Sequence, residues 1–446
     1  MKMPIVSVSL CCLFVMISVI GVYGVTKIKP GLSRIIIRGG RFVEKDSGRQ
    51  FTPLGVNYYR LGNEKIGKSV HAAFCPGVYD RVYIEKMMKD VAGWGFNTVR
   101  TFQSYYIGED GILTSDKARE INPTYLANML HFLQQAKKNG IHVIFSWDIW
   151  VPKSDWWSTM PMPNEAKYGF RPDWEEDMGV NGYRVHLGSV RTRANAIKTL
   201  IQAIRKNDPG LLPVVLSWEL ENEIYFVTDK APYNNRQGTF SFKGKSYDLS
   251  SDDQAQTSMD DIITNWVNAC TETIHQADPE ALVDAGLFSF AAVGRRGPGT
   301  LSKDKTADSR VPARPLALLR SKMDYVDIHL YAWRTDKESV TDYLNRNLQS
   351  IEWQKLKSEA KKIGKPIMSG EIGIFANYLR KPPALKIDHE LGLECLQEHA
   401  KGIKANGLAG VLYWYYGSPD SSVEDECPPL SLFPKYAELI KDIWEK

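Results

Sequence analysis

Short apolar segments alternate with longer segments of helical periodicity along most of the chain. Eight segments are apolar and rich in β-branched or aromatic residues, as buried strands are; they cover residues 51–59, 96–102, 141–147, 213–222, 281–288, 325–333, 365–375 and 407–416. Between them, apolar residues recur at helical spacing over 81–95, 123–140, 189–206, 257–277, 350–364 and 388–407. Several helical segments close on glycine (KKNG, KKIG, KANG), which is typical of helix C-termini.

This alternation predicts an α/β fold with a parallel sheet, because each strand is followed by a crossover segment. Eight such units usually close into a (β/α)₈ TIM barrel, and we expect one barrel domain without a linker or repeat. An open doubly wound sheet is the alternative, but no Gly-x-Gly-x-x-Gly motif follows the first strand. Residues 34–51, which precede that strand, predict a small hairpin that caps the barrel floor.

Three long insertions, rich in Gly, Asp and Ser, follow the third, fourth and fifth predicted strands. They cover roughly residues 152–183, 228–251 and 291–314. All three lie at the carboxyl ends of their strands, the face on which barrel enzymes build their active sites. We therefore expect them to wall a cleft.

The first 24 residues differ from the rest of the chain. One lysine is followed by a long apolar run that ends at Gly24, the pattern of a secretory signal peptide. We expect a leader over 1–24, a catalytic domain over 25–446 and a secreted protein without membrane contact after cleavage. An uncleaved membrane anchor is the alternative, since the apolar run is long.

Four cysteines remain after the leader. They are Cys75, Cys270, Cys395 and Cys427. In an exported protein they could form two disulfides in any of three pairings, but they are too scattered for a zinc site.

Composition excludes some partners. A net charge of +4 over 446 residues, without a block of like charges, does not suggest a nucleic-acid partner. Aromatic residues make up 11% of the chain and include 12 Trp and 21 Tyr; this suits either an aromatic core or a groove in which flat rings pack on sugars. We expect a monomer. We also expect no metal or cofactor, because no ligand motif such as His-Glu-x-x-His is present.

Carboxylates stand at the ends of two predicted strands. Glu223 follows the fourth strand, and Glu371 lies near the end of the seventh, after the small pair Ser369-Gly370. Two glutamates that face each other across one barrel mouth are what retaining glycoside hydrolysis requires. A single acid at a strand end is more often a solvated or ion-paired residue, so the argument rests on the pair. For Glu219 we expect a structural role inside the barrel.

Other strand ends add polar and aromatic side chains to this mouth. Arg100 lies on the second strand, and Trp147 and Asp148 end the third. His329 and Tyr331 share one face of the sixth strand by two-residue alternation, and Trp414 ends the eighth.

Taken in order, the motifs WELENE, DIHLY, MSGEIG and LYWYY, with an arginine on the second strand, resemble glycoside hydrolase family 5. That family belongs to the clan of retaining (β/α)₈ enzymes, and WELENE and DIHLYAW look most similar to its endo-β-mannanase branch. The chain departs from the family at three places. Ile224 and Ala332 stand where prolines are expected, and Trp147-Asp148 occupy a region where many members have a histidine.

The resemblance implies a role for each matching residue. Glu223 would be the acid/base with a raised pKa, and Glu371 the nucleophile with a low one. Arg100 and Tyr331 would hydrogen-bond the nucleophile, while His329 would position the acid/base or the substrate. The remaining substrate contacts would come from Asn222, which would hold a sugar 2-hydroxyl, from Trp414 as a platform under a sugar ring, and from the Trp147 and Asp148 region.

These implications predict a secreted endo-β-glycanase that acts on β-1,4-mannan or a related β-glucan, and the polysaccharide is its expected partner. Two alternatives remain open: a carbohydrate-binding barrel without turnover, and an exo-glycosidase or transglycosylase with the same chemistry.

Overall fold

The computed structural model describes residues 32–148, 156–157, 178–185, 187–303, 308–332, 341–342, 351–375, 380–381, 386–422 and 427–445. The chain divides into two units, Met1–Gly31 and Leu32–Lys446, and the first, with the expected leader, lies outside the described residues. Most of the expected insertion over 152–183 also lies outside them. Within the described part of the chain, no helix combines the length and the apolarity that crossing a bilayer requires.

Eight parallel strands form a closed barrel in the second unit. The first four are β3 (Leu54–Tyr58), β4 (Thr98–Gln103), β5 (His142–Trp147) and β6 (Val215–Glu219). The fifth is broken at Ala285 into β10 (Leu282–Asp284) and β11 (Gly286–Phe288), and the last three are β13 (Val326–Ala332), β14 (Ile367–Ile374) and β17 (Val411–Tyr413). Because β10 pairs with β6 and β11 with β13, the two halves of the fifth strand close the ring. The TIM-barrel prediction is confirmed.

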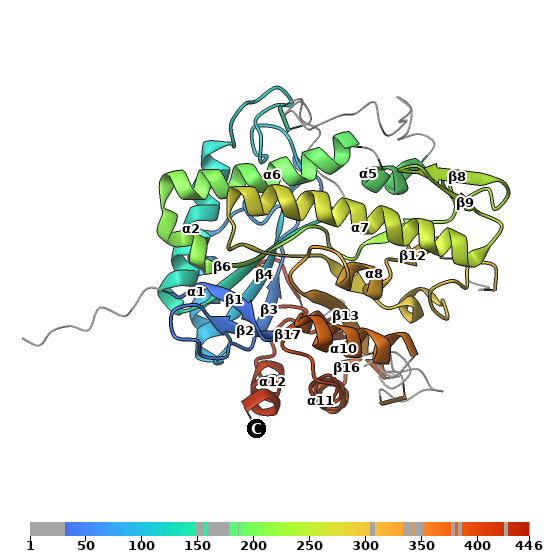
Figure 1. Cartoon of the computed structure of the whole chain (residues 1–446). Coiled ribbons are helices and arrows are strands. Elements are labelled where there is room, and N and C mark those ends of the chain that lie inside the picture. The colour runs from blue at the N-terminus through green and yellow to red at the C-terminus, as the bar shows by residue number, and fades with distance from the viewer. Residues whose placement is uncertain are drawn as a thin grey trace, which may run out of the picture. The chain divides into compact units, whose positions relative to one another are not determined.

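Helices cover the outside of the strands, as α6 and α7 show in Figure 1. They are α1 (Arg81–Gly93), α2 (Pro123–Asn139), α6 (Leu187–Asn207), α7 (Asp252–Ala277), α8 (Pro315–Leu319), α10 (Ile351–Ile363), α11 (His389–Ala405) and α12 (Lys435–Glu445). All six expected helices are present. Helix α7 begins five residues before the predicted start, because Ser251 caps it by accepting a hydrogen bond from the backbone of Gln254. Two helices of this layer were not predicted: α8, which is too short for a period to show, and α12.

The hairpin expected before the first strand closes the barrel floor. It consists of β1 (Ile35–Arg38) and β2 (Arg41–Glu44), which pair antiparallel. Its apolar side chains pack against residues of several barrel strands, in one cluster that includes Ile35, Phe42, Ile144, Leu216, Leu282, Met368 and Leu412. The lower end of the barrel is therefore apolar and sealed, so the polar side chains of the interior lie above it.

Two insertions contain structure that the sequence pattern did not reveal. After β6 the chain forms β7 (Tyr225–Val227), which pairs antiparallel with β12 (Arg310–Pro312) from the insertion after the fifth strand. A second hairpin, β8 (Thr239–Phe242) with β9 (Lys245–Asp248), precedes α7. The β7–β12 pair brings Arg310 beside the carboxyl end of β6, where Glu223 lies.

The four cysteines do not form the disulfides that were considered. All four are buried, and none is joined to another of them. Cys270 lies on α7 and Cys395 on α11, so these two residues belong to different helices of the outer layer. They pack as small apolar side chains in the core.

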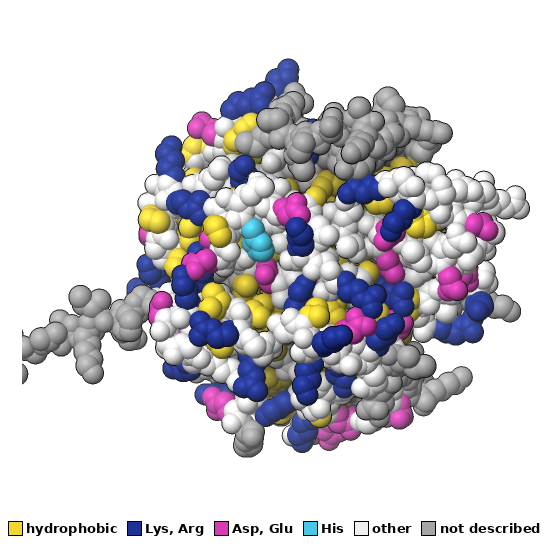
Figure 2. All heavy atoms as spheres, in the orientation of Figure 1, with side chains coloured by type: hydrophobic (Ala, Val, Ile, Leu, Met, Phe, Trp, Pro, Cys, Tyr) yellow, Lys and Arg dark blue, Asp and Glu magenta, His cyan; other side chains and the backbone are white. Residues whose placement is uncertain are grey.

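The surface that Figure 2 shows carries basic side chains interspersed with acidic and uncharged ones. Among the described residues, the large hydrophobic side chains that are exposed are Leu61, Val82, Ile363 and Leu432. None of these is aromatic, and they lie far apart in the sequence. Aromatic platforms for a sugar must therefore be sought in a cleft.

Candidate active site

A cavity of about 470 Å³ opens at the carboxyl ends of the barrel strands. Seven of the nine residues proposed from the sequence line it: Asp148, Asn222, Glu223, His329, Tyr331, Glu371 and Trp414. The eighth, Arg100, lies directly beneath and is wholly buried. The structure thus brings together residues from six different strands or their ends.

Glu371 lies near the end of β14 with its side chain almost fully buried. Both hydrogen bonds expected for it are present: Arg100 Nη1 donates to Oε1 at 2.7 Å, and the Tyr331 hydroxyl donates to Oε2 at 2.5 Å. A cation and a phenol that bond the two oxygens separately stabilise the ionised carboxylate and fix its rotamer.

Glu223 lies four residues beyond the end of β6, and it is the more open of the two acids. Its side chain is 28% exposed, whereas that of Glu371 is 5% exposed. Its backbone adopts a left-handed conformation (φ +51°), which costs a non-glycine residue of order 1 kcal/mol and is found mainly at functional sites. The Nδ1 atom of His329 lies 3.1 Å from its Oε1.

The two glutamates are close enough for retaining chemistry. One carboxylate oxygen of each, together with a ring nitrogen of His329, lies within 4.8 Å of the others. Retaining glycosidases hold their two carboxyl groups about 5–5.5 Å apart, whereas inverting enzymes leave roughly 6.5–9.5 Å for a water molecule. The separation here matches the retaining class.

The charge distribution in the cleft differs from the one expected. Burial alone would raise the pKa of Glu223, but the hydrogen bond from His329 and the charges of His329, Arg100 and Arg310 together outweigh burial, and the pKa is lowered. Burial raises the pKa of Glu371, against the charges of His329 and Arg100. The two pKa shifts are thus opposite to the expected ones, because the donors and charges around Glu223 outweigh its burial, whereas burial prevails at Glu371.

His329 carries the proton in this arrangement. Burial opposes its charged form, but the charge of Glu371 and the hydrogen bond to Glu223 raise the pKa of His329 to about 9. Near neutral pH its Nδ1–H therefore donates to Glu223. The nitrogen that holds the proton an acid catalyst needs thus lies 3.1 Å from Oε1 of Glu223.

Arg100 joins the mouth of the barrel to the layer below it. It donates to both oxygens of Glu219 at 2.5 and 2.6 Å, and Ser146 adds a third bond to Glu219 at 2.9 Å. Its Nη2 also donates to Oδ1 of Asn222 at 2.7 Å. With that oxygen engaged, the amide nitrogen of Asn222 is left to face the cleft. The structural role expected for Glu219 is confirmed.

Trp414 and Trp147 have different surroundings. Trp414 lines the cleft and stacks on Tyr59, with ring centroids 4.9 Å apart and an angle of 11° between the planes. Trp147 is wholly buried, with the guanidinium of Arg193 over its ring, so it is not the substrate contact that was expected. Its neighbour Ser146 points into the barrel toward Glu219, and alternation therefore turns Trp147 outward.

Two-residue alternation in the sequence also predicts one shared face for Glu219, Glu221 and Glu223. This prediction is wrong for Glu221, because β6 ends at Glu219 and the chain bends after it. Glu221 is buried outside the barrel mouth and forms an ion pair with Arg184 of α5 (Gly182–Val185).

Several cleft residues were missed. They are His71, Phe102, Phe288, Ser289, Ala292, Val293, Arg310 and Phe375. Phe102 has the same parity on β4 as Arg100, so alternation could have identified it. Neither His71, in the loop after β3, nor Arg310, on β12, has a local signal, because tertiary pairing alone brings them to the cleft.

Among the described residues, two groups of three titratable side chains have donor atoms within 4.8 Å of one another, a spacing that could hold a cation. We call the first the mouth trio; its members are Glu223, His329 and Glu371. We call the second the lower trio; its members are Glu219, Asp284 and Asp327. Arg100 bonds Glu371 of the first and Glu219 of the second, so a protein cation already lies between them.

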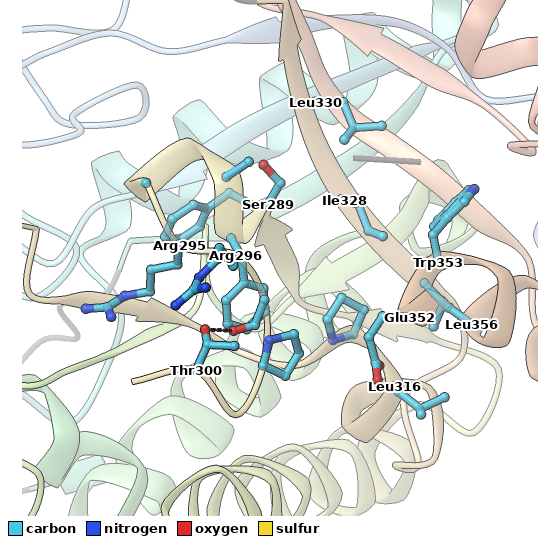
Figure 3. A pocket seen from close by; sticks show the side chains of 17 residues that line it. Ser289, Arg295, Arg296, Thr300, Leu316, Ile328, Leu330, Glu352, Trp353 and Leu356 are labelled. Carbon is cyan, nitrogen blue, oxygen red and sulfur yellow. Dashed lines mark hydrogen bonds between the residues drawn. The ribbon is translucent and has the colours of Figure 1, made fainter. Parts of the chain in front are cut away.

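A second cavity, of about 560 Å³, lies outside the barrel strands (Figure 3). Trp353 and Leu356 of α10 and the outward side chains of Ile328 and Leu330 line one side of it. Its acid, Glu352, accepts hydrogen bonds from two nitrogens of Arg314. This cavity is mainly apolar and contains no pair of acids, so the cleft at the strand ends is the candidate active site.

Comparisons with known proteins bear on the fold and the family of this chain. Among solved structures, the endo-1,4-beta-mannanase from Rhizomucor miehei is 17% identical with a TM-score of 0.56, over 93% of this chain and 100% of that one. The exo-beta-1,4-mannosidase Op5Man5 from Opitutaceae bacterium strain TAV5 is 16% identical with a TM-score of 0.52, and the match covers 91% of this chain and 62% of that one. The endo-beta-1,4-mannanase from Thermotoga petrophila is 15% identical with a TM-score of 0.52, and the match covers 88% of this chain and 78% of that one. Identities this low show the shared fold.

The curated proteins contain no match to this chain. The family described as Cellulase (glycosyl hydrolase family 5) matches residues 64–417, which is most of the chain and includes every residue of the mouth trio. The chain therefore belongs to glycoside hydrolase family 5.

Proposed function

We propose that this glycoside hydrolase cleaves β-1,4-linked mannan, or a related β-glucan, with retention of anomeric configuration. The observation that carries the proposal is the pair Glu223 and Glu371, whose carboxylate oxygens lie within 4.8 Å of each other at the mouth of the barrel. A protein that only binds sugars has no need of two acids at this separation.

The reaction takes place in two steps. Glu371 attacks the anomeric carbon while Glu223, which takes the Nδ1 proton of His329, passes a proton to the glycosidic oxygen, so the bond to the leaving sugar breaks as the glycosyl ester forms. Glu223 then takes a proton from water, and the resulting hydroxide displaces Glu371. Arg100 and Tyr331 stabilise the carboxylate that leaves in the second step.

Mannan is favoured over other β-glycans by two observations. The motifs WELENE and DIHLYAW look most similar to those of mannanases. The structural neighbours described above are named mannanases or mannosidases. Ile224 and Ala332, in place of prolines, depart from that branch, so a related β-glucan remains the second candidate substrate.

Endo action is favoured by another cavity next to the Trp414 side of the cleft. Tyr59, which stacks on Trp414, also lines this cavity, of about 580 Å³, together with Arg60 and Tyr415. A polymer that runs past Trp414 would find polar and aromatic contacts there. Exo action predicts that products are released one sugar at a time, which product analysis separates from endo cleavage.

We also propose that the protein is secreted as a monomer after removal of residues 1–24. The proposal of secretion rests on the lysine near the start, the apolar run and the small residue Gly24. N-terminal sequencing of the protein from the culture medium, and its mass in solution, test these two points.

The decisive experiment measures reducing ends released from mannan, glucomannan, cellulose and β-1,3-glucan. We expect Glu371→Ala and Glu223→Ala to lower turnover on mannan by about 10²–10⁴-fold or more without loss of fold. With an activated aryl β-mannoside, azide should restore turnover of Glu223→Ala as the β-azide and of Glu371→Ala as the α-azide. Near-full activity of either variant contradicts the proposal, and binding without release supports the non-catalytic alternative.

A further inference from the structure

The nucleophile lies in an irregular stretch of its strand. The register between β13 and β14 shifts between Asp327 and Leu330, and that between β14 and β17 shifts between Ser369 and Ile372. Gly370 and Glu371 therefore lie where regular pairing is interrupted on both sides. Such bulges re-aim a side chain, and they recur next to active sites.

Side chains from two other strands hold this stretch in place of the regular pairing. The N–H of Gly370 donates to Oδ1 of Asp327, and its carbonyl accepts a hydrogen bond of 2.8 Å from Nδ2 of Asn57. Asn57 also accepts from Nη1 of Arg100 at 2.8 Å, the same nitrogen that bonds Glu371. One connected set of bonds thus fixes both the backbone and the carboxylate of the nucleophile.

The fit at Gly370 leaves no room for a side chain. A Cβ atom at this position would lie 2.0 Å from Oδ2 of Asp327 and 2.7 Å from its Cγ. Asp327 is wholly buried, so its carboxyl group cannot swing away into solvent. The acid and the glycine are therefore complementary in shape as well as in hydrogen bonding.

We propose that Asp327 is a positioning residue for the nucleophile: with Asn57 it clamps Gly370 and so fixes the bulge that aims Glu371 at the anomeric carbon. We call Asp327, Asn57 and Gly370 the Gly370 clamp. The inference rests on the proposed function, because the orientation of Glu371 affects turnover only if Glu371 is the nucleophile. It assigns no contact with substrate to Asp327.

Asp284 provides the comparison that separates positioning from simple structural support. It belongs to the same buried lower trio, but its Oδ1 accepts a hydrogen bond from Ser217 on β6 and makes none with the bulge. Both aspartates are wholly buried, and in each Oδ2 has no hydrogen-bond partner. If burial of an acid were all that mattered, the two residues would be equivalent.

The kinetic test compares these two aspartates. We expect Asp327→Ala to lower kcat by about 10²-fold with KM within twofold of wild type, because a displacement of about 1 Å at the reacting group costs that much. Asp327→Asn retains an oxygen for the Gly370 N–H and should recover most of kcat. Asp284→Ala should leave kcat within twofold. Equal kcat for Asp327→Ala and Asp284→Ala, or a loss that Asn does not rescue, overturns the inference.

A thermal-unfolding cycle tests the clamp without any substrate. Gly370→Ala should lower Tm, because the new methyl group meets the Asp327 carboxyl group. In Gly370→Ala/Asp327→Ala that space is vacated, so the double variant should unfold at a higher temperature than Gly370→Ala alone. A double variant whose Tm loss equals or exceeds the sum of the two single losses contradicts the clamp. An inactive wild-type protein would contradict the proposed function and leave this cycle interpretable.

Discussion

The two trios of the barrel interior place similar groups in different surroundings. In the mouth trio, one acid is partly open to the cleft, and Arg100, Tyr331 and His329 surround the pair with donors. In the lower trio all three acids are wholly buried, and the bonds are divided unevenly. Glu219 is bonded at both oxygens, whereas Asp284 and Asp327 each have one oxygen without a hydrogen-bond partner.

This difference shows that carboxylates in one barrel can serve opposite purposes. Acids at the mouth are poised to exchange protons and form bonds, and they can do so because the cleft gives a ligand access to them. Acids one layer below cannot reach a ligand, so they act by fixing the positions of the groups to which they are hydrogen-bonded. Arg100 couples the layers, because its charge is shared between Glu219 and Glu371.

Removing the charge of Glu219 should have the largest effect on stability. Glu219→Gln leaves the buried guanidinium of Arg100 with one acid fewer, and breaking a buried pair from one side typically costs about 3–5 kcal/mol. We expect a loss of that size in urea unfolding, with reduced activity because Arg100 also bonds Glu371. Glu371→Gln is the matched variant in the mouth trio: it should abolish turnover with a smaller loss of stability. Equal stability losses in the two would erase the distinction between the layers.

The barrel and the two glutamates could be predicted from the sequence because both depend on local patterns. Strand and helix periodicity can be recognised from neighbouring residues in the sequence. The same is true of an acid that follows directly on the end of a strand. What failed depended on tertiary geometry. The bend after β6 separated Glu219 from Glu221, and the inward turn of Ser146 sent Trp147 into the core.

The charge states could not be predicted for the same reason. They depend on the balance, at each carboxylate, between burial and the charges of His329 and Arg100, which only the tertiary arrangement determines. The role of Gly370 was equally hidden. Its place before Glu371 was visible in the sequence, but its contact with Asp327 requires two strands in register with a bulge between them.

Asp327 should make the stability of the fold depend on pH. Burial, with the charge of Glu219, raises the pKa of Asp327 to about 7, against the opposing charges of His329 and Arg100. The other acid that interacts with it is Asp284 on β10. Because its folded pKa lies above the unfolded value near 3.9, the stabilising contribution is complete below about pH 4 and is lost as pH rises to about 7.

Asp327→Asn removes this titration. Between pH 5 and pH 7 the free energy of unfolding of the variant should therefore decline less steeply than that of wild type, by up to about 1.4 kcal/mol per pH unit. Chemical unfolding at pH 5, 6, 7 and 8 measures the slope. The same slope in both proteins would mean that Asp327 already carries its charge at pH 5.

The smallest expected effects come from a matched pair of hydroxyl deletions, one in each layer. Tyr331→Phe removes a donor 2.5 Å from Glu371, and Ser146→Ala removes one 2.9 Å from Glu219. A hydrogen bond to a charged group contributes about 1.5–3 kcal/mol, and one among several donors contributes less.

Tyr331→Phe should therefore lower kcat/KM about tenfold or more with little change in Tm, because Glu371 needs that donor when it leaves as an anion. Ser146→Ala should lower stability by about 1 kcal/mol and leave kcat/KM within twofold, because Arg100 still bonds both oxygens of Glu219. If Ser146→Ala reduced turnover as much as Tyr331→Phe, the lower layer would be part of the catalytic machinery, and the division between reacting and supporting acids would not hold.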